Sequence, residues 1–310
     1  MPLRVAIPGG TGLIGTRLVG ELLDRGHEPI VLTRSPERSR DRFPGIGVRR
    51  WSPEDSGDNC APFDDADAIV NLAGAPIDAG RWTVERKDRI RDSRVNGTRR
   101  VVRCAASGSR RAEVLVAGSA VGYYGSRGDA CLDEGTAGGT GFLADVCEAL
   151  EREAEAASDL GMRVIRLRTG VVLSAEGGAL EKISRPFRFG LGGRLADGRQ
   201  WFSWIHMADL VRMIVHCLET RSISGAVNAV SPNPVSNADF TKTLGDVLGR
   251  PAVLRVPGPV LRLAIGELAD ALLSSQRAVP DRLLRDGFSF EFPDLRQALE
   301  DCLLSSDRAG

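Results

Sequence analysis

A glycine-rich turn near the start of the chain constrains the fold more than any other feature. Residues 3–7 are apolar and strand-like, and residues 13–25 have a helical pattern. Gly9 and Gly12 lie between these two segments, and Gly15 lies in the first turn of the expected helix. In such a strand–turn–helix unit the first glycine permits a tight turn. The second lets the backbone approach a pyrophosphate, and the third lets helix and strand pack closely. A lone glycine trio is a weak signal, but this context predicts a dinucleotide at the positive end of the helix.

The rest of the first half alternates strand-like and helical stretches, which is typical of βαβ units with a parallel sheet. The expected strands are residues 3–7, 29–33, 48–51, 68–72, 114–117 and 164–167, and the expected helices are residues 13–25, 82–106 and 142–160. We therefore predict an α/β fold with a Rossmann-type doubly wound parallel sheet.

The rhythm changes after residue 173. Residues 174–203 are rich in Gly and Arg and are expected to form long loops. Later residues predict a helix near 208–218, a strand near 226–229, a helix near 237–248 and a mixed tail. We expect a cofactor domain at residues 1–175 with return segments near 201–230. A smaller, partly interleaved part at residues 176–310 would carry substrate-side or lid loops.

The end of the second expected strand bears on cofactor choice. An acidic residue there commonly binds the 2′-hydroxyl of NAD, whereas an arginine accommodates the 2′-phosphate of NADP. This chain has Thr33 and Arg34 at that point, with Arg38 and Arg40 close behind. A guanidinium can pair with a phosphate in bidentate fashion. The alternative is a solvated basic loop, and the sequence favours NADP(H) over NAD(H).

Composition excludes several other classes. Lys plus Arg and Asp plus Glu each total 41 in 310 residues, so the net charge is zero and indicates neither nucleic acid nor an anionic membrane as a partner. No apolar run reaches the roughly 18–20 residues of a membrane span, and the N-terminus does not look like a signal peptide. The six cysteines are scattered, which argues against a metal site or a disulfide framework and suggests a reducing cytoplasm.

Five local motifs carry a family resemblance. They are GGTGLIG at 9–15, NLAG at 71–74, SRVNGT at 93–98, GSAVGYYG at 118–125 and WFSWIHMADL at 201–210. With them the whole chain resembles an atypical branch of the extended short-chain dehydrogenase/reductases. The branch is the "epimerase family" of NAD-dependent epimerase/dehydratase-like proteins, whose members carry a C-terminal domain of unknown function. The tail SQRAVPDRLLRDGFSFEFPDL is similar to that domain.

The resemblance assigns roles to individual residues. It places Asn96 where the wider family has the asparagine of its catalytic tetrad, and it places Val172 beside the nicotinamide end of the cofactor. Simple core packing is the alternative for Leu72, Ala73 and Val172. Together with the glycine-rich turn, the expected cofactor residues are Gly9, Thr11, Gly12, Leu13, Ile14, Gly15, Thr33, Arg34, Leu72, Ala73, Gly74, Arg94 and Val172.

The catalytic signature of the superfamily, Tyr-x-x-x-Lys, is absent. None of the three lysines has a tyrosine four positions earlier. If the helix is aligned on Glu151, Leu143 takes the tyrosine position and Cys147 takes the lysine position. Leucine cannot transfer a proton, so the standard chemistry is excluded in that register.

Replacement groups are conceivable. Ser119 or Ala120 fills the serine position, depending on how the motif is counted. Tyr123 and Tyr124 follow it near the expected pocket, although in the wider family the tyrosine before this glycine is mostly structural. Cys147 is a thiolate candidate or an inert small hydrophobe. The catalytic candidates are Ser119, Tyr123, Tyr124 and Asn96, and the substrate-side candidates are Trp204 and His206, the latter alternatively structural.

Three functions remain open from the sequence. The first is an NADP(H)-dependent oxidoreductase acting on a carbonyl or hydroxyl group of an unidentified small molecule. The second is a catalytically silent NADP(H) sensor, which the missing tyrosine and lysine favour. The third is a nucleotide-sugar epimerase or dehydratase, which ranks lower because that chemistry normally uses the same tyrosine. A homodimer is expected only by analogy with the superfamily.

Overall fold

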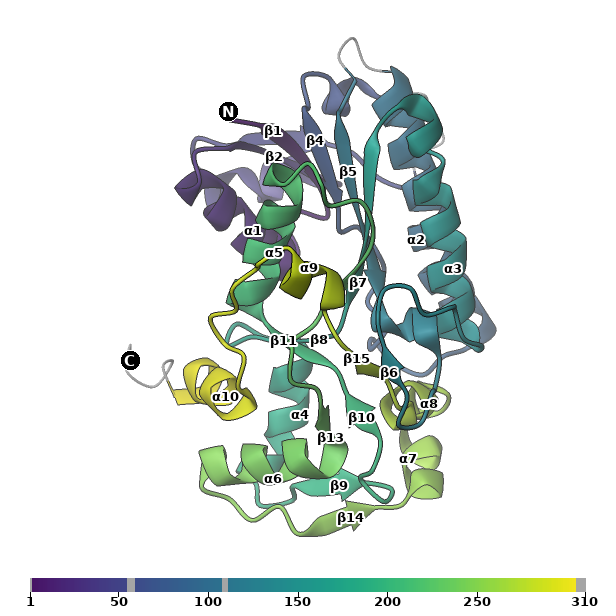
Figure 1. Cartoon of the computed structure of the whole chain (residues 1–310), viewed down its shortest axis with the longest axis vertical. Coiled ribbons are helices and arrows are strands. Elements are labelled where there is room, and N and C mark those ends of the chain that lie inside the picture. The colour runs from purple at the N-terminus through teal and green to yellow at the C-terminus, as the bar shows by residue number, and fades with distance from the viewer. Residues whose placement is uncertain (1, 55–58, 108–110, 305–310) are drawn as a thin grey trace.

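A seven-stranded sheet forms the centre of the larger part of the molecule (Figure 1). The computed structural model describes residues 2–54, 59–107 and 111–304. The strand order is β12-β7-β5-β4-β1-β2-β3, and every pair in this sheet is parallel. The strands are β1 (Arg4–Pro8), β2 (Glu28–Thr33), β3 (Gly47–Arg50), β4 (Ala68–Asn71), β5 (Val114–Ala120), β7 (Arg163–Thr169) and β12 (Gly225–Ala229). The order reverses between β1 and β4, so the predicted doubly wound Rossmann-type sheet is confirmed.

Helices cover both faces of the sheet, because its strands are apolar on both sides. The four helices are α1 (Leu13–Asp24), α2 (Val84–Ser107), α3 (Phe142–Glu155) and α5 (Met207–Glu219). One buried cluster joins the sheet to α1 and α5, and a second joins its other face to α2 and α3. Val5, Ile69 and Leu115 are fully buried in the strands between them. The carboxyl ends of the strands, where ligands bind in such sheets, face the second part of the chain.

In the described residues, the second part is built from short strand pairs and six helices. The helices are α4 (Ala179–Arg188), α6 (Asn237–Leu248), α7 (Gly258–Ile265), α8 (Leu268–Leu273), α9 (Asp281–Arg285) and α10 (Leu295–Leu304). The strands are β6 (Cys131–Leu132), β8 (Val171–Leu173), β9 (Gly193–Leu195), β10 (Trp201–Phe202), β11 (Trp204–His206), β13 (Val235–Ser236), β14 (Leu254–Val256) and β15 (Arg277–Ala278). They pair as β8 with β11, β9 with β14, β10 with β13 and β6 with β15.

The expectation of long loops at residues 174–203 is wrong, because α4 and the short strands β9 and β10 form there. Leu180 and Phe187 of this helix are buried in the core of the second part. The glycine-rich and arginine-rich sequence conceals the pattern, and Pro186 lies inside the helix. Tertiary packing of a few apolar residues therefore outweighs weak local propensity.

A disulfide joins Cys60 to Cys104, although the scattered cysteines predicted no disulfide framework. Cys60 precedes a short 3-10 helix at Ala61–Phe63, and Cys104 lies in α2. Both belong to the same buried cluster, so the fold brings together residues 44 positions apart. Sequence spacing alone could not show this pairing.

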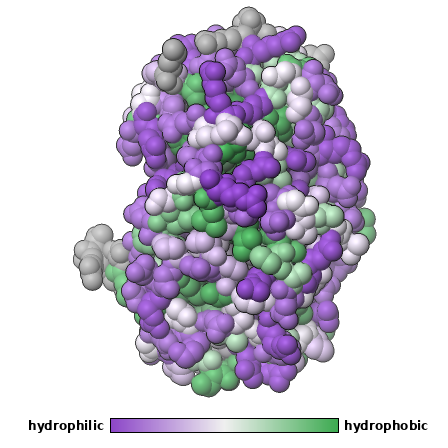
Figure 2. Space-filling model, viewed as in Figure 1, coloured by the Kyte–Doolittle hydropathy of each residue, from purple (hydrophilic) through white to green (hydrophobic). Residues whose placement is uncertain are grey.

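The outer surface in Figure 2 is largely hydrophilic, with apolar residues scattered through it and gathered in places. None of the helices in the described residues has the length and apolar character needed to cross a bilayer.

Candidate functional site

The glycine-rich turn lies directly against the chain that leaves β4. Gly9 has a φ of +82°, and a Cβ atom built on it would lie 2.7 Å from the carbonyl carbon of Leu72 and 2.8 Å from the nitrogen of Ala73. A side chain would therefore push the two backbones apart. The amide of Leu72 in turn donates to the carbonyl of Pro8 (2.9 Å). The backbone of Gly9 thus lies directly against the backbone of Leu72 and Ala73, although more than sixty residues separate the two segments in the sequence.

The same turn leaves the start of α1 open to a ligand. A Cβ on Gly15 would lie 2.5 Å from the carbonyl oxygen of Gly9, so helix and turn pack backbone to backbone. Gly12 is the N-cap, and no side chain caps the helix. The first turn of α1 carries no acidic residue, so nothing there offsets the positive end of the helix dipole. This arrangement suits the pyrophosphate of a dinucleotide, with Thr11, Leu13 and Ile14 around it.

Arg34 follows the end of β2 and is exposed, and among the described residues it has neither a carboxylate partner nor a hydrogen bond. Arg38 and Arg40, close behind, also lack a carboxylate partner there. Thr33 ends the strand, and its carbonyl accepts from the amide of Trp51 (2.9 Å). Three guanidinium groups are therefore available beside the end of β2.

A half-buried guanidinium lies over the chain beyond β4. A Cβ on Gly74 would meet the Cζ atom of Arg94 at 3.1 Å, so the two are in direct contact. Arg94 donates only to backbone carbonyls, those of Ala75 (2.9 Å) and Ile90 (3.2 Å). Burial lowers the pKa of Arg94. A desolvated cation with no carboxylate partner among the described residues is suited to an anionic group of a ligand.

Asn96 lies on the outer side of the same helix. Its side chain is exposed, and its oxygen accepts a hydrogen bond from Arg99 (3.1 Å), which also pairs with Glu153 of α3. This geometry therefore does not favour the catalytic role that was expected for Asn96. From this helix it is Arg94, two residues earlier, that faces the loop after β4.

A buried ion pair supports the floor of the site between β5, α3 and β7. Arg168 donates to both carboxylate oxygens of Glu151, at 2.9 Å and 2.8 Å, and both side chains are almost inaccessible. Burial opposes the charge on Arg168, but the hydrogen bonds and attraction of Glu151 outweigh it and raise its pKa. Ser119 at the end of β5 donates to the same carboxylate (2.7 Å). The hydroxyl proton of Ser119 is thus directed at Glu151, and the buried thiol of Cys147 lies beside the same hydroxyl.

The two tyrosines after β5 have different surroundings. The hydroxyl of Tyr124 is completely buried, donates to Asn228 (2.7 Å) and receives a hydrogen bond from Arg168 (3.0 Å). Burial raises its pKa. Tyr124 is therefore a structural group and not the proton donor that the sequence allowed. Tyr123 places its ring over the guanidinium of Arg168, 3.5 Å from Cζ to the ring centroid. Its hydroxyl has no hydrogen-bond partner among the described residues and is not fully enclosed.

The positions of the missing catalytic pair are filled by apolar or neutral groups. Leu143 lies against Gly122, with a Cβ on that glycine meeting the leucine Cβ at 3.3 Å. Cys147 is buried beside Ser119, and burial raises the pKa of its thiol to about 11. It is therefore a neutral thiol near pH 7, which argues against the thiolate alternative.

Trp204 and His206, the two substrate-side candidates, are both buried, which argues against the contact with substrate that was expected of them. Trp204 is fully buried, and its indole donates to the carbonyl of Asn233 (3.1 Å). His206 is the N-cap of α5, where its Nδ1 accepts from the amide of Ala208 (3.3 Å). Neither side chain is presented to a ligand. Val172 lies in β8, partly buried against the main core and paired with β11.

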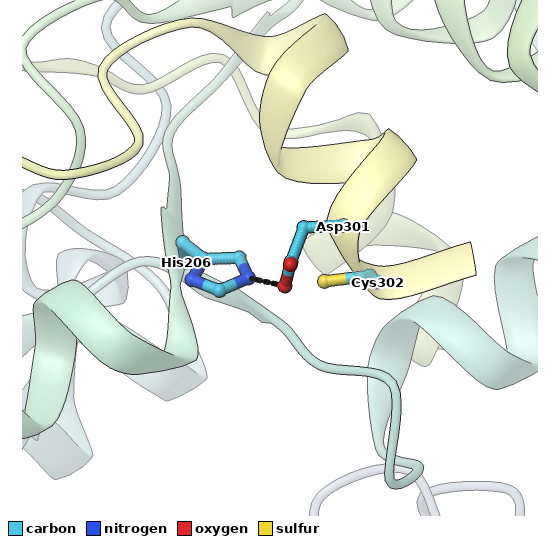
Figure 3. A group of neighbouring side chains, drawn as sticks. All are labelled: His206, Asp301 and Cys302. Carbon is cyan, nitrogen blue, oxygen red and sulfur yellow. Dashed lines mark ion pairs between the residues drawn. The ribbon is translucent and has the colours of Figure 1, made fainter. Parts of the chain in front are cut away.

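Figure 3 shows the one group of His, Cys, Asp and Glu side chains in the described residues that is compact enough to hold a metal ion. It consists of His206, Asp301 and Cys302. Because His206 Nδ1 accepts a backbone hydrogen bond, the neutral ring carries its proton on Nε2, which lies 3.1 Å from the Asp301 carboxylate. That nitrogen has no lone pair for a metal, and the group is better described as a clamp between α5 and α10.

Sequence reasoning missed Arg168, which links Glu151, Tyr123 and Tyr124. A signal was present, because Arg168 directly follows the strand predicted at residues 164–167, and an arginine buried there requires a partner. The sequence could not identify that partner, because Glu151 is on a helix and the contact depends on the pairing of β5 with β7.

Comparisons with known proteins identify the family of this chain. The profile of the NAD dependent epimerase/dehydratase family matches residues 5–229, and a domain of unknown function, DUF1731, matches residues 256–302. An epimerase family protein of Mycobacterium bovis is 40% identical over 95% of this chain and 96% of its own. The crystal structure of human epimerase family protein SDR39U1 (isoform 2) with NADPH is 34% identical, with a TM-score of 0.85 over 97% of this chain and 99% of that one. A structure named as a nucleoside-diphosphate sugar epimerase from Corynebacterium glutamicum is 37% identical, with a TM-score of 0.78 over 98% of this chain and 58% of that one.

Proposed function

The chain belongs to the NAD dependent epimerase/dehydratase family, and from that premise we propose that it is an NADP(H)-binding, atypical oxidoreductase. Its substrate is a small molecule with a carbonyl or hydroxyl group. The NADPH bound to the human relative supports the choice of cofactor. The observation that carries the proposal is Arg34, an exposed guanidinium without a carboxylate partner in the described residues, at the end of β2.

The residues at the carboxyl edge of the sheet fit this cofactor. The start of α1 and the turn at Gly9 and Gly12 would hold the pyrophosphate, because their backbones leave no side chain in its way. Arg34 would pair with the 2′-phosphate. Leu72 and Ala73 would lie along the adenosine half, and Arg94 would offer a positive charge beyond β4.

Titration with NADPH and NADH tests the cofactor assignment. Replacing Arg34 by alanine removes a charge-assisted contact that only the 2′-phosphate can make. We expect NADPH affinity to fall roughly tenfold to a hundredfold, and NADH affinity to stay the same. Arg111→Ala is a matched control, because Arg111 is exposed just before β5 at the opposite end of the strands. Equal binding of the two cofactors by the unaltered protein would refute the role of Arg34.

The reaction requires a proton as well as the hydride that the bound cofactor supplies. We assign the proton to Tyr123, whose hydroxyl has no partner among the described residues and whose ring rests on the Arg168 cation. Ser119 would accept a hydrogen bond from the substrate, because its own proton is directed at Glu151.

Turnover of a panel of aldehydes and ketones with NADPH tests this assignment. Tyr123→Phe should lower kcat by roughly a hundredfold to ten-thousandfold and leave the Kd for NADPH unchanged. Tyr124→Phe is not an equivalent control, since it would leave Asn228 and Arg168 unsatisfied. Val84→Ala, an exposed position on α2, should behave like the unaltered protein. Full activity of Tyr123→Phe would exclude Tyr123 as the donor.

A catalytically silent NADP(H) sensor is the second candidate, and the replacement of the catalytic pair by Leu143 and Cys147 favours it. A sensor should bind NADPH and NADP⁺ with different affinities and turn over none of the carbonyl panel. The third candidate, a nucleotide-sugar epimerase, agrees with the name of the Corynebacterium relative. It requires a cofactor that stays bound through purification and room for a nucleoside diphosphate.

A further inference from the structure

Two segments of the second part contain no acidic residue. Residues 182–196 carry Lys182, Arg185, Arg188 and Arg194, and residues 247–266 carry Arg250, Arg255 and Arg262, with no Asp or Glu in either. The whole chain has equal numbers of acidic and basic residues, so these stretches depart sharply from its average. The net charge of the whole chain is zero, which led us to expect no membrane partner. This average conceals the local excess of basic residues in the two segments.

The fold joins the two segments through one pair of strands. Strand β9 of the first pairs in parallel with β14 of the second, with Gly193 beside Leu254. The amide of Leu254 also donates to the carbonyl of Gly192 (3.3 Å). In Figure 1 both strands lie at the lower end of the molecule, beside α6 and α7. We call residues 182–196 and 247–266 the basic end.

The basic end also exposes large apolar side chains. Of the eleven large hydrophobic residues exposed in the described chain, six belong to it. They are Phe189 (76% exposed), Leu191 (62%), Val253 (85%), Leu254 (45%), Val260 (54%) and Leu263 (78%). In Figure 2 apolar and hydrophilic surface lie side by side at this lower end. Such a concentration in a small part of the sequence differs from the scattered exposure that is normal for soluble proteins.

Most of the cations there have no carboxylate partner. All seven are exposed, and only Lys182 and Arg262 form ion pairs in the described residues, with Asp78 and Asp270. Arg255 donates to a backbone carbonyl of Ala196. The remaining charges are free to meet an anionic surface.

We propose that the basic end docks on a membrane surface that contains anionic lipids. Exposed Phe, Leu and Val side chains would enter the boundary between headgroups and acyl chains, and the arginines would bind the phosphates around them. A second copy of this chain is a poor occupant, because two such surfaces would repel each other. Nucleic acid would match the charges, but it offers nothing to the aliphatic side chains, which dominate the exposed set.

Vesicle flotation with the full-length protein tests the proposal. We expect binding to vesicles in which roughly one lipid in three is phosphatidylglycerol, and not to vesicles of phosphatidylcholine alone. Added salt should weaken the binding, because it screens the charges. Leu191→Asp combined with Val253→Asp should reduce binding at least about tenfold, and so should Arg188→Gln combined with Arg250→Gln. All four side chains are exposed, so the variants should melt like the unaltered protein, which is checked first.

Val84→Asp provides the matched control, since Val84 is 68% exposed on α2, outside the basic end. It should bind the anionic vesicles as the unaltered protein does. Failure to bind either kind of vesicle overturns the proposal. So does binding that both double variants retain, or displacement of the vesicles by a DNA duplex. Loss of a dimer in Leu191→Asp with Val253→Asp, without vesicle binding, would assign the surface to self-association and also overturn it.

Discussion

Arg168 and Glu151 place two full charges where water scarcely reaches, and they tie β7 to α3 beneath the candidate site. The arrangement is tolerated because each charge is neutralised by the other and the remaining hydrogen-bonding groups have partners. Ser119 donates to the carboxylate, and Tyr124 accepts from the guanidinium. Removing one member leaves the other charged, buried and unpaired.

Arg168→Met should therefore destabilise the protein by about 3–5 kcal/mol, because the Glu151 carboxylate loses its counter-charge. Urea denaturation followed by circular dichroism measures the change. Arg152→Met is the control: it removes an arginine that pairs with Glu148 on the exposed side of α3. That variant should lose no more than about 0.5 kcal/mol. Similar losses in the two variants would contradict the account of a buried pair.

At this scale the sequence predicted residues whose roles depend on local spacing. Gly9, Gly12 and Gly15 lie where expected, because a tight turn between strand and helix needs them whatever the rest of the chain does. The side chains of Asn96 and Trp204 could not be placed from spacing. Their directions depend on helix rotation and on packing with distant segments.

Helix α1 shows how one element can contain a glycine that is required and another that is not. Gly15 faces the turn, where an added Cβ would lie 2.5 Å from the oxygen of Gly9 and 2.6 Å from the Cα of Gly10. Gly20, one and a half turns later, is exposed and has nothing within 4 Å of its Cβ position. A comparison of substitutions at the two positions therefore separates the effect of backbone packing from the effect of helix propensity.

Gly15→Ala should destabilise the protein by roughly 1–3 kcal/mol and weaken NADPH binding, because the turn must move away from the helix. Gly20→Ala should stabilise it by roughly 0.5–1 kcal/mol, because alanine is the better helix former and nothing opposes its methyl group. Thermal melting and NADPH titration of both variants give the comparison. A neutral Gly15→Ala would mean that helix and turn are not in close contact.

Elements with strong periodicity were predicted well, and elements held by tertiary contacts were not. The strands of the sheet and helices α1, α2, α3, α5 and α6 lie within a few residues of their expected ranges. In contrast, α4 has a proline inside it and a glycine-rich surrounding sequence, so only the burial of Leu180 and Phe187 reveals why it is helical. The helix is stable because it packs against the rest of the second part.

At the scale of the whole molecule, a set of contacts attaches the C-terminal segment to the start of α5. Asp209 is buried and accepts hydrogen bonds from the amides of Glu291 (2.8 Å) and Phe292 (2.9 Å). His206 lies against the ring of Phe292, 3.9 Å between centroids, and pairs with Asp301 of α10. The motif at residues 201–210, which resembles the family's substrate-side motif, therefore acts here as an attachment point for the last helix.

This attachment should make stability depend on pH through His206. Burial lowers the pKa of His206 below its ordinary value of 6.5, although Asp301 and Asp209 act in the opposite direction. The folded protein therefore favours the neutral ring, and its full contribution to stability is present above the unfolded pKa. As the pH falls through that value the unfolded chain takes up the proton first, so stability decreases.

His206→Asn separates this effect from other acid-sensitive groups, because asparagine keeps an N-cap acceptor for the amide of Ala208 but does not titrate. The unaltered protein should lose melting temperature between about pH 7.5 and about pH 5.5, and the variant should lose less over the same interval. Melting followed by circular dichroism at several pH values gives both slopes. Equal slopes would show that the neutral histidine does not stabilise the attachment of α10. A steeper slope in the variant would mean that the ion pair with Asp301 outweighs burial.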